Sequence, residues 1–212
     1  MYGIDVSHWQ GSIDWNKVKN AKYEFAFIKC SEGISWVDPK FKQNQDQARK
    51  AGVLCGFYHF ANQNDPIKEA EWFMKSVGEL QSGELLALDA ETGQSPDWCK
   101  KFLDRVSELA GFKPLLYAPV GNGGDWSKVY NANYGLWIAR YASSKVYIPY
   151  YLSPAPKIAV WPFYAIWQYS SKGSVSGIAG NVDVNYSKMD LATLRKYGKQ
   201  AVCLHCPIHC PR

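Results

Sequence analysis

Long hydrophobic runs are missing from this sequence of 212 residues. No stretch approaches the roughly 18 consecutive apolar residues that a membrane-spanning helix requires, so no membrane span is expected. The opening residues, MYGIDVSHWQG, also lack the basic start, apolar core and small-residue cleavage site of a secretory signal. We therefore expect a protein that is made in the cytoplasm and stays there unless another device releases it.

Nucleotide-binding and zinc-hydrolase motifs are absent as well. The sequence contains neither G-x-G-x-x-G nor G-x-x-x-x-G-K-S/T, which hold dinucleotides and nucleoside phosphates, and it contains no H-E-x-x-H zinc motif. Basic residues are only slightly in excess: 24 Lys and Arg against 19 Asp and Glu leave a net charge of +5. This charge is too modest to imply nucleic acid, and we expect none as a partner.

Aromatic residues, by contrast, are abundant at 15% of the chain. They can build an aromatic core, and Tyr and Trp also offer flat apolar faces with a polar edge, on which sugar rings stack. With 47% hydrophobic and 20% charged residues, the chain has enough apolar surface to fold. Its length suits one large domain.

The six cysteines fall into two groups. Cys30, Cys55 and Cys99 lie in apolar or helical stretches, where buried and unreactive thiols are expected. The other three lie near the C-terminus with two histidines, in a cluster that comprises Cys203, His205, Cys206, His209 and Cys210. Such a cluster could bind zinc or form disulfides. Its spacing matches no closed zinc module, so we interpret residues 199–212 as an unstructured tail and expect no metal site.

Strand and helix signals alternate along the chain. Apolar runs predict strands at residues 2–7, 23–30, 53–61, 84–91, 113–118, 135–142, 164–171 and 178–187. Amphipathic stretches predict helices at residues 14–21, 38–52, 65–80 and 95–111, of which the second and third start with Asp-Pro and the fourth is capped by Ser95. The alternation predicts an α/β protein with a parallel sheet, and its length favours an irregular TIM-like (β/α) barrel.

Four acidic residues lie where predicted strands leave the core. Asp5 ends the first strand, Asp89 and Glu91 end the fourth, and Asp183 lies in the last. Asp89 and Glu91 share one face of a strand, about 6.6 Å apart along the backbone, where one carboxylate can raise the pKa of the other. Taken singly, each acid could instead cap a helix or a turn. In a barrel, however, the carboxyl ends of the strands meet and form the active site.

Aromatic and amide side chains end the other predicted strands, among them Tyr58, Tyr117, Trp137 and Gln168. A cleft with acids at its centre and rings on its walls suits a glycosidase. One protonated carboxyl gives a proton to the leaving oxygen, and negative charge stabilises the oxocarbenium-like centre. We predict that these four residues contact the sugar by stacking or by hydrogen bonds.

Several longer motifs resemble those of the family 25 glycoside hydrolases, lysozymes that include many bacteriophage endolysins. They are YGIDVSHWQGSIDW, FAFIKCSEG, GFYHFA, LALDAE, LWIARY, IWQYSS and GIAGNVDVN, in the family's order. The resemblance extends from Tyr2 to about Tyr197. It implies one catalytic domain at residues 1–198, an irregular barrel closed by late antiparallel strands, and no cofactor.

The resemblance also implies an activity and a role for each acid. The chain would be an N-acetylmuramidase, which cuts the β-1,4 bond between N-acetylmuramic acid and N-acetylglucosamine in peptidoglycan. Glu91 would be the general acid, with a pKa raised by neighbouring carboxylates, and Asp89 its ionised partner. Asp5 and Asp183 would hold the sugar and set the electrostatic field. Asp89 either attacks the anomeric carbon or orients the substrate's own acetamido group to attack it, and we favour the second.

Three rival functions are weighed against this one. A carbohydrate-binding barrel without turnover is disfavoured because all four acids are present. A chitinase would carry a longer D-x-x-D-x-D-x-E run, and a zinc-dependent amidase or peptidase would carry a zinc motif; neither is found. As an endolysin, the protein is expected to be a monomer, made in a bacterial host cytoplasm, that acts on the cell wall after release through a holin-type pore or by lysis.

Overall fold

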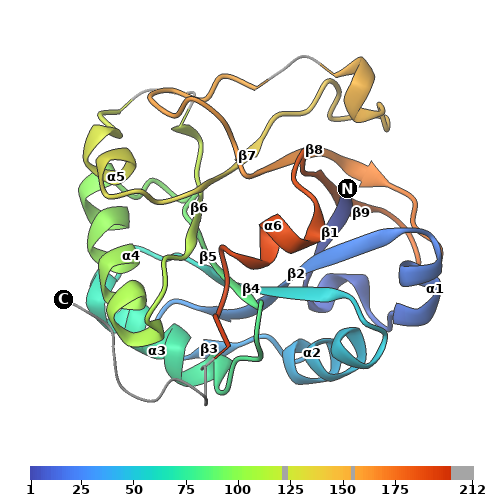
Figure 1. Ribbon diagram of the computed structural model, residues 1–212, viewed down its shortest axis with the longest axis horizontal. Helices are drawn as coiled ribbons and strands as arrows, with labels where there is room; N and C mark the ends of the chain where they lie inside the picture. The colour runs from blue at the N-terminus through green and yellow to red at the C-terminus, as the bar shows by residue number, and fades with distance from the viewer. Residues whose placement is uncertain (121–123, 154–155, 202–212) are drawn as a thin grey trace, which may run out of the picture.

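The computed structural model describes residues 1–120, 124–153 and 156–201, which form an α/β barrel (Figure 1). Among these residues, eight strands close the ring: β1 (Tyr2–Val6), β2 (Tyr23–Glu32), β4 (Leu54–Phe60), β5 (Leu85–Asp89), β6 (Leu115–Tyr117), β7 (Leu136–Ala139), β8 (Ile166–Gly173) and β9 (Val182–Tyr186). A short strand, β3 (Trp36–Val37), pairs with β2.

Strand directions in the ring are mixed. Neighbouring strands run parallel from β1 through β2, β4, β5, β6 and β7 to β8, whereas β9 runs antiparallel to both β8 and β1. The register at this closure places Asp5 of β1 opposite Asp183 of β9. The predicted α/β class and irregular TIM-like barrel are confirmed, and a single late strand supplies the antiparallel part.

Helices α1 to α5 lie outside the ring, and α6 lies at one end of it. The helices are α1 (Trp15–Asn20), α2 (Phe41–Lys50), α3 (Pro66–Val77), α4 (Pro96–Ala110), α5 (Ser127–Asn131) and α6 (Leu191–Arg195). As predicted, Asp65 and Ser95 cap α3 and α4, each followed by proline. The predicted start of the second helix at Asp38 is wrong: α2 begins at Phe41, and Asp38 Oδ2 instead binds the backbone and ring nitrogens of His8.

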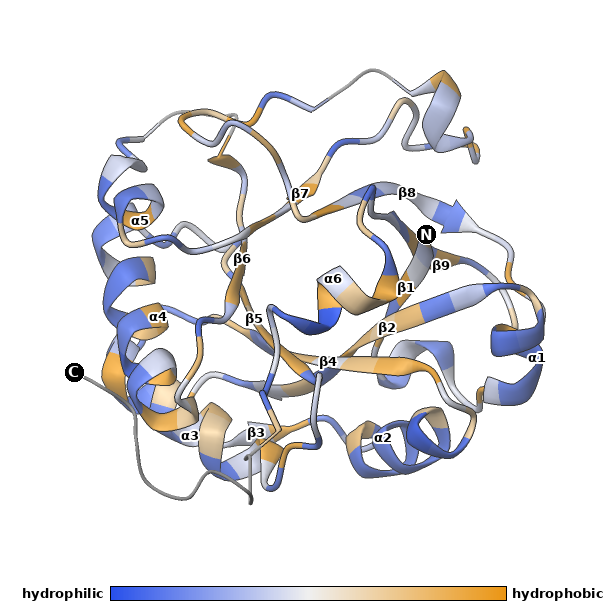
Figure 2. Cartoon of the chain, in the orientation of Figure 1, coloured by the Kyte–Doolittle hydropathy of each residue, from blue (hydrophilic) through white to orange (hydrophobic). Residues whose placement is uncertain are grey.

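Alternation along the strands separates two layers of buried side chains, and apolar colour follows most strands in Figure 2. Outward-facing side chains pack against the helices, while inward-facing ones fill the barrel. Phe25 and Phe27 of β2 fit inside because neighbouring strands carry glycine: a Cβ on Gly3 or Gly56 would stand 2.3 Å or 2.4 Å from their rings. Toward the carboxyl ends of the strands, the inward-facing positions become polar.

Helix α6 closes the amino-terminal end of the barrel and lies across it in Figure 1. Leu194 is fully buried there against Phe25, Leu54 and Leu85, which lie near the starts of their strands. This closure leaves the opposite end, where the parallel strands finish, for polar side chains.

Lys199, which directly follows the predicted domain boundary at residue 198, is hydrogen-bonded to the segment before β5. The backbone of Lys199 accepts a hydrogen bond from Gly83 at 2.6 Å and donates one to Glu84 at 2.8 Å. The cysteine and histidine cluster at residues 203–210 lies outside the described residues. The other three cysteines are buried and form no disulfide, as predicted. In the part of the chain that is described, no helix has the length and apolar character needed to cross a membrane.

Candidate active site

The carboxyl ends of the strands surround a cleft of about 450 Å³. All eight side chains predicted for the site lie on its wall: Asp5, Tyr58, Asp89, Glu91, Tyr117, Trp137, Gln168 and Asp183. They meet because the parallel strands carry inward-facing positions toward their carboxyl ends, while the antiparallel β9 carries Asp183 near its start. Residues that are far apart in the sequence therefore form one site.

Two amide side chains hold Asp5 in the cleft. Gln168 Nε2 and Asn185 Nδ2 both donate to Asp5 Oδ2, at 2.8 Å and 2.7 Å. The Gln168 amide is itself fixed, because its Oε1 accepts hydrogen bonds from the hydroxyls of Tyr117 at 3.0 Å and Tyr141 at 2.6 Å. Sequence analysis did not assign Tyr141 or Asn185, which act here through their neighbours.

The aromatic wall of the cleft is largely buried. Trp137 Nε1 donates to Asn185 Oδ1 at 2.8 Å, and the Trp137 ring lies 4.5 Å from that of Phe27. Exposed fractions are 2% for Trp137, 3% for Gln168 and 9% for Tyr58, so little of their surface is open to a sugar. Their contact with substrate stays a prediction, whereas the geometry shows Trp137 and Gln168 supporting the acids.

Asp5 of β1 and Asp183 of β9 lie opposite each other, and their carboxyl groups interact. Two carboxyls in contact cannot both ionise at ordinary cost. Burial and the Asp183 charge raise the pKa of Asp5 well above its usual range, while burial, with a contribution from Glu91, raises the pKa of Asp183 to about 6. The pair therefore keeps one proton more readily than two solvated carboxylates would.

Asp89 ends β5 with an unpaired oxygen. Its Oδ1 is buried and has no hydrogen-bond partner among the described residues. Burial raises the pKa of Asp89, the charges of Glu91 and Asp5 raise it further, and Lys29 opposes them. Because an unpaired buried oxygen is costly, Asp89 is placed to accept a hydrogen bond from a molecule in the cleft.

Glu91 lies just beyond β5 and is accessible from solvent. The surrounding protein nevertheless removes enough water to raise its pKa, against the opposing charge of Lys29. The direction agrees with the sequence prediction, and burial is the main cause of the raised pKa. A solvent-accessible carboxyl that keeps its proton can serve as a general acid.

Sequence analysis missed Lys29, a buried cation on β2 that faces the same cleft. Its Nζ pairs with Glu32 at 2.8 Å and lies over the rings of Phe60, at 4.4 Å, and Trp36, at 5.1 Å. Its charge lowers the pKa of both acids at the end of β5. The signal was present in FAFIKC, where this lysine has the same strand parity as the two inward-facing phenylalanines.

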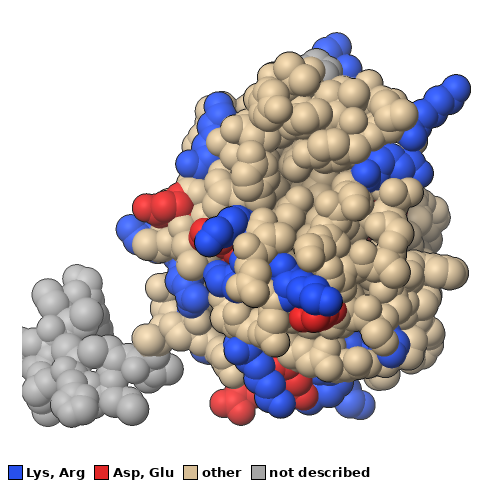
Figure 3. All heavy atoms as spheres, turned by 90° about the vertical axis from the view of Figure 1, so that its right-hand side faces the viewer, with Lys and Arg blue, Asp and Glu red and all other residues tan. Residues whose placement is uncertain are grey.

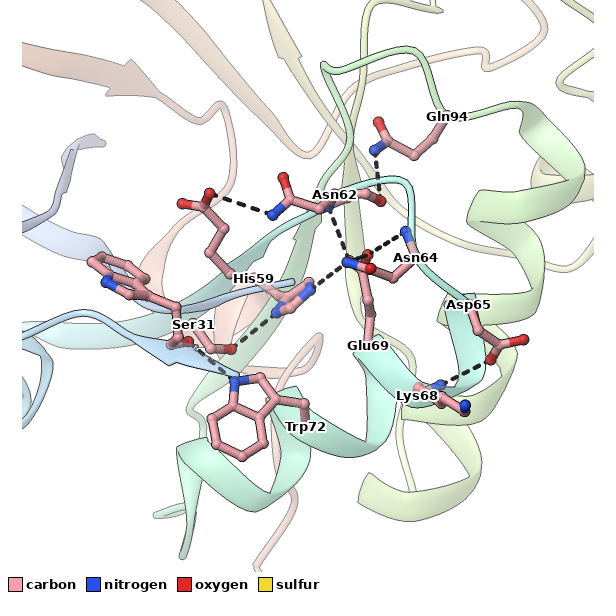
Figure 4. A network of polar contacts seen from close by, with 12 residues as sticks. Ser31, His59, Asn62, Asn64, Asp65, Lys68, Glu69, Trp72 and Gln94 are labelled. Atoms are coloured by element: carbon pink, nitrogen blue, oxygen red, sulfur yellow. Dashed lines mark hydrogen bonds and ion pairs between the residues drawn. The ribbon is translucent and has the colours of Figure 1, made fainter. Parts of the chain in front are cut away.

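A buried network braces the loop that follows β4 (Figure 4). His59 Nδ1 lies 2.9 Å from Ser31 Oγ, and His59 Nε2 lies 2.9 Å from Glu69 Oε2. Glu69 also accepts the backbone N–H groups of Asn62 and Asn64, each at 3.0 Å. His59 is fully buried and burial lowers its pKa, so its role in this network is structural.

This braced loop in turn holds the loop that carries Glu91. Gln94 Nε2 donates to the carbonyl of Asn62 at 3.1 Å, and Thr92 Oγ1 donates to the carbonyl of Ala61 at 2.9 Å. The position of Glu91 therefore depends on hydrogen bonds that begin at a buried histidine on the neighbouring strand.

The rim of the cleft carries an exposed aromatic residue that sequence analysis did not assign. Trp9 is 81% exposed, and its ring lies 4.6 Å from that of His8.

On the face drawn in Figure 3, Lys and Arg side chains lie in separate groups rather than in one basic surface. Within the described residues, no three or more His, Cys, Asp or Glu side chains are arranged to hold a metal ion.

Comparison with known proteins places this site in a family. The model of glycosyl hydrolases family 25 matches residues 4–178, which is most of the chain and includes Asp5, Asp89 and Glu91. The chain belongs to glycosyl hydrolase family 25. Asp183 lies a few residues beyond the matched segment and joins the site through the pairing of β1 with β9.

Similar proteins and solved structures agree with this assignment. The chain is 35% identical over 191 residues to the autolytic lysozyme of Clostridium acetobutylicum, covering 87% of this chain and 55% of that protein. It thus spans about half the length of that relative. The crystal structure of a lysozyme from Streptomyces coelicolor superposes with a TM-score of 0.79 and 30% identity, covering 94% and 97% of the two chains. The CTP1L endolysin superposes with a TM-score of 0.76 and 30% identity, covering 92% and 69%.

Proposed function

We propose that this family 25 chain is a lysozyme, which hydrolyses the β-1,4 bond between N-acetylmuramic acid and N-acetylglucosamine in bacterial peptidoglycan. The observation that carries the proposal is the convergence of Asp5, Asp89, Glu91 and Asp183 on one cleft at the carboxyl end of the barrel. Similarity to bacterial lysozymes supports the choice of substrate.

In this proposal, Glu91 donates a proton to the glycosidic oxygen as that bond breaks. Its raised pKa keeps the carboxyl protonated closer to neutral pH, and its solvent-accessible position lets it reach the leaving oxygen. After the leaving sugar departs, the resulting carboxylate takes a proton from the water that completes hydrolysis.

Asp89 holds the acetamido group of the substrate. Its unpaired Oδ1 accepts the acetamido N–H, and the acetamido carbonyl oxygen then attacks the anomeric carbon. Burial is the main cause of the raised Asp89 pKa, and Glu91 is the largest contributing charge. Protonation of Glu91 removes that charge, and Lys29 also lowers the Asp89 pKa; both effects favour the ionised Asp89 that this proposal requires.

The Asp5 and Asp183 pair supplies negative charge to the same cleft. Because the two carboxyls share one proton, the pair carries a single charge, which the amides of Gln168 and Asn185 hold in place. A fixed charge of this kind stabilises the positive charge that develops at the anomeric carbon without any rearrangement during the reaction.

We propose further that the chain acts in the manner of an endolysin. It would work as a monomer on the cell wall, after release from a bacterial host cytoplasm through a holin-type pore or by lysis. Similarity to the CTP1L endolysin supports this part of the proposal. The predicted division into a catalytic unit at residues 1–198 and a tail at residues 199–212 belongs to it as well.

Product analysis of purified peptidoglycan tests the proposed activity. Borohydride reduction of the digest identifies each new reducing end, and muramic acid ends alone are expected. Reducing glucosamine ends would indicate a glucosaminidase, new free amino groups would indicate an amidase or peptidase, and intact glycan would indicate a binding protein. The rate is expected to be unchanged by a metal chelator, because carboxyl groups perform the proposed steps.

A further inference from the structure

A second hollow, of about 300 Å³, opens beside the acidic cleft. The two spaces share Glu91, Tyr117 and Tyr141 as a common wall. The remaining wall of the second hollow carries Arg140 and Lys157, so its charge is opposite to that of the cleft. We call this hollow the cationic pocket.

The two cations of the pocket have no carboxylate partner among the described residues. Both side chains are exposed, and neither takes part in an ion pair within the described residues. The backbone of Arg140 is nevertheless fixed: its N–H donates to the Gln168 carbonyl at 3.0 Å, and its carbonyl accepts from Trp167 Nε1 at 3.0 Å. A planar guanidinium on a fixed backbone is well suited to bind a carboxylate.

We propose that the cationic pocket binds a carboxylate on the side arm of a muramic acid residue next to the bond that is cut. This inference rests on the proposed muramidase function. Muramic acid differs from N-acetylglucosamine by a lactyl group, which in the cell wall is extended by a peptide that carries free carboxylates. N-acetylglucosamine has no such arm, so muramic acid alone can place an anion against Arg140 and Lys157.

Binding the arm in this pocket gives the glycan a direction. The acids of the neighbouring cleft repel an anionic arm and accept a neutral sugar ring. Because the two sugars alternate along the chain, fixing the arm beside Glu91 determines which of the two kinds of glycosidic bond meets the acid. The cationic pocket is therefore a specificity determinant as well as a source of affinity.

Kinetics with matched variants and substrates test this role. The variants are Arg140→Gln, Lys157→Gln and the double variant, and Lys101→Gln is the control, an exposed lysine on α4 outside both hollows. Each is assayed for KM and kcat on soluble glycan chains in three forms. The first carries intact peptides, the second has been stripped by an amidase and keeps only lactyl carboxylates, and the third has its peptide carboxylates blocked as neutral amides.

On intact chains, each single variant is expected to raise KM about threefold and the double variant about tenfold, with kcat nearly unchanged, as for exposed ion pairs. Lys101→Gln should match the wild type. On blocked chains, the KM of the wild type should rise to that of the double variant on intact chains. The KM of the double variant should rise no further. On intact chains the lactyl carboxyl is an amide, so the difference there comes from the peptide carboxylates. Stripped chains expose the lactyl carboxylate and will retain a difference only if the pocket also binds that group.

Two results would overturn the inference. One is an unchanged KM for the double variant on intact chains, and the other is an equal rise in KM on intact and blocked chains, which would indicate general damage to the cleft. Failure of the proposed function looks different, because the wild type would then release no reducing muramic acid ends from any of the three substrates.

Discussion

The charges around a carboxyl group influence whether it is protonated or ionised. In the acidic cleft, one such charge is the ammonium group of Lys29. It lowers the pKa of Asp89 and of Glu91, which have to be in opposite protonation states for the proposed reaction. The balance between these two acids is therefore set at a third residue, which contacts Glu32 and aromatic rings rather than either acid.

Replacing that cation should move the whole pH profile. In Lys29→Met, the pKa of both acids rises. The acid limb of the profile reports the loss of the Asp89 proton, and the alkaline limb reports the loss of the Glu91 proton. Both limbs should therefore shift to higher pH. Lys29→Arg keeps the charge and should restore the original limbs. The measurement is kcat/KM against pH. Unchanged limbs in Lys29→Met would show that this charge does not reach the acids.

The Asp5 and Asp183 pair should cost stability at neutral pH. The pKa of Asp183 rises from 3.8 to about 6 on folding, so the folded state holds its proton more tightly, and its stability falls as pH rises between these values. Asp183→Asn should therefore lose activity and raise the melting temperature by a few degrees at pH 7, with the gain shrinking toward pH 4. A melting temperature below that of the wild type at pH 7 would contradict this.

At the scale of elements, short apolar runs were the most informative feature of the sequence. They predicted all eight strands of the ring, with acids where strands leave the core. They did not reveal the bracing of Glu91, because the contacts from Glu69 of α3 to Asn62 and from Asn62 to Gln94 involve loops whose sequences have no period. Such loop contacts depend on the assembled barrel.

The buried brace offers a test at the same scale. Glu69→Gln places an amide where two backbone N–H groups and the His59 ring donate hydrogen bonds. The lost hydrogen bonds should lower the unfolding free energy by about 2–4 kcal/mol. The loop that carries Glu91 should then be held less firmly, which lowers kcat. Glu71→Gln, an exposed change on the same helix, should cost less than about 1 kcal/mol. Denaturant unfolding and steady-state kinetics measure both. Equal effects of the two variants would argue against the brace.

At the scale of the whole molecule, helix α6, near the end of the described chain, covers the amino-terminal end of the barrel. Helix α6 was not predicted, because five residues are too few to show a helical period. Its position became clear only once Leu194 was seen among side chains from strands throughout the chain. The sequence thus predicted the ring and the acids that line its cleft, while long-range packing decided what covers each end.

This closure predicts a global effect of one side chain. Leu194→Ala leaves a cavity at the amino-terminal end of the barrel and should lower the unfolding free energy by about 2–5 kcal/mol without changing the denaturant slope. Leu109→Ala on α4, where the side chain is 43% exposed, is the control and should cost much less. Similar losses in the two variants would mean that α6 is not part of the cooperative core.

The central claim, that Glu91 is the general acid of a muramidase, is tested most directly by counting new reducing muramic acid ends released from peptidoglycan. The wild type and Glu108→Gln, an exposed change on α4, should release them at equal rates. Glu91→Gln, folded and still bound to the wall, should be slower by a factor of about 10²–10⁴. Release by Glu91→Gln at the wild-type rate would contradict the account.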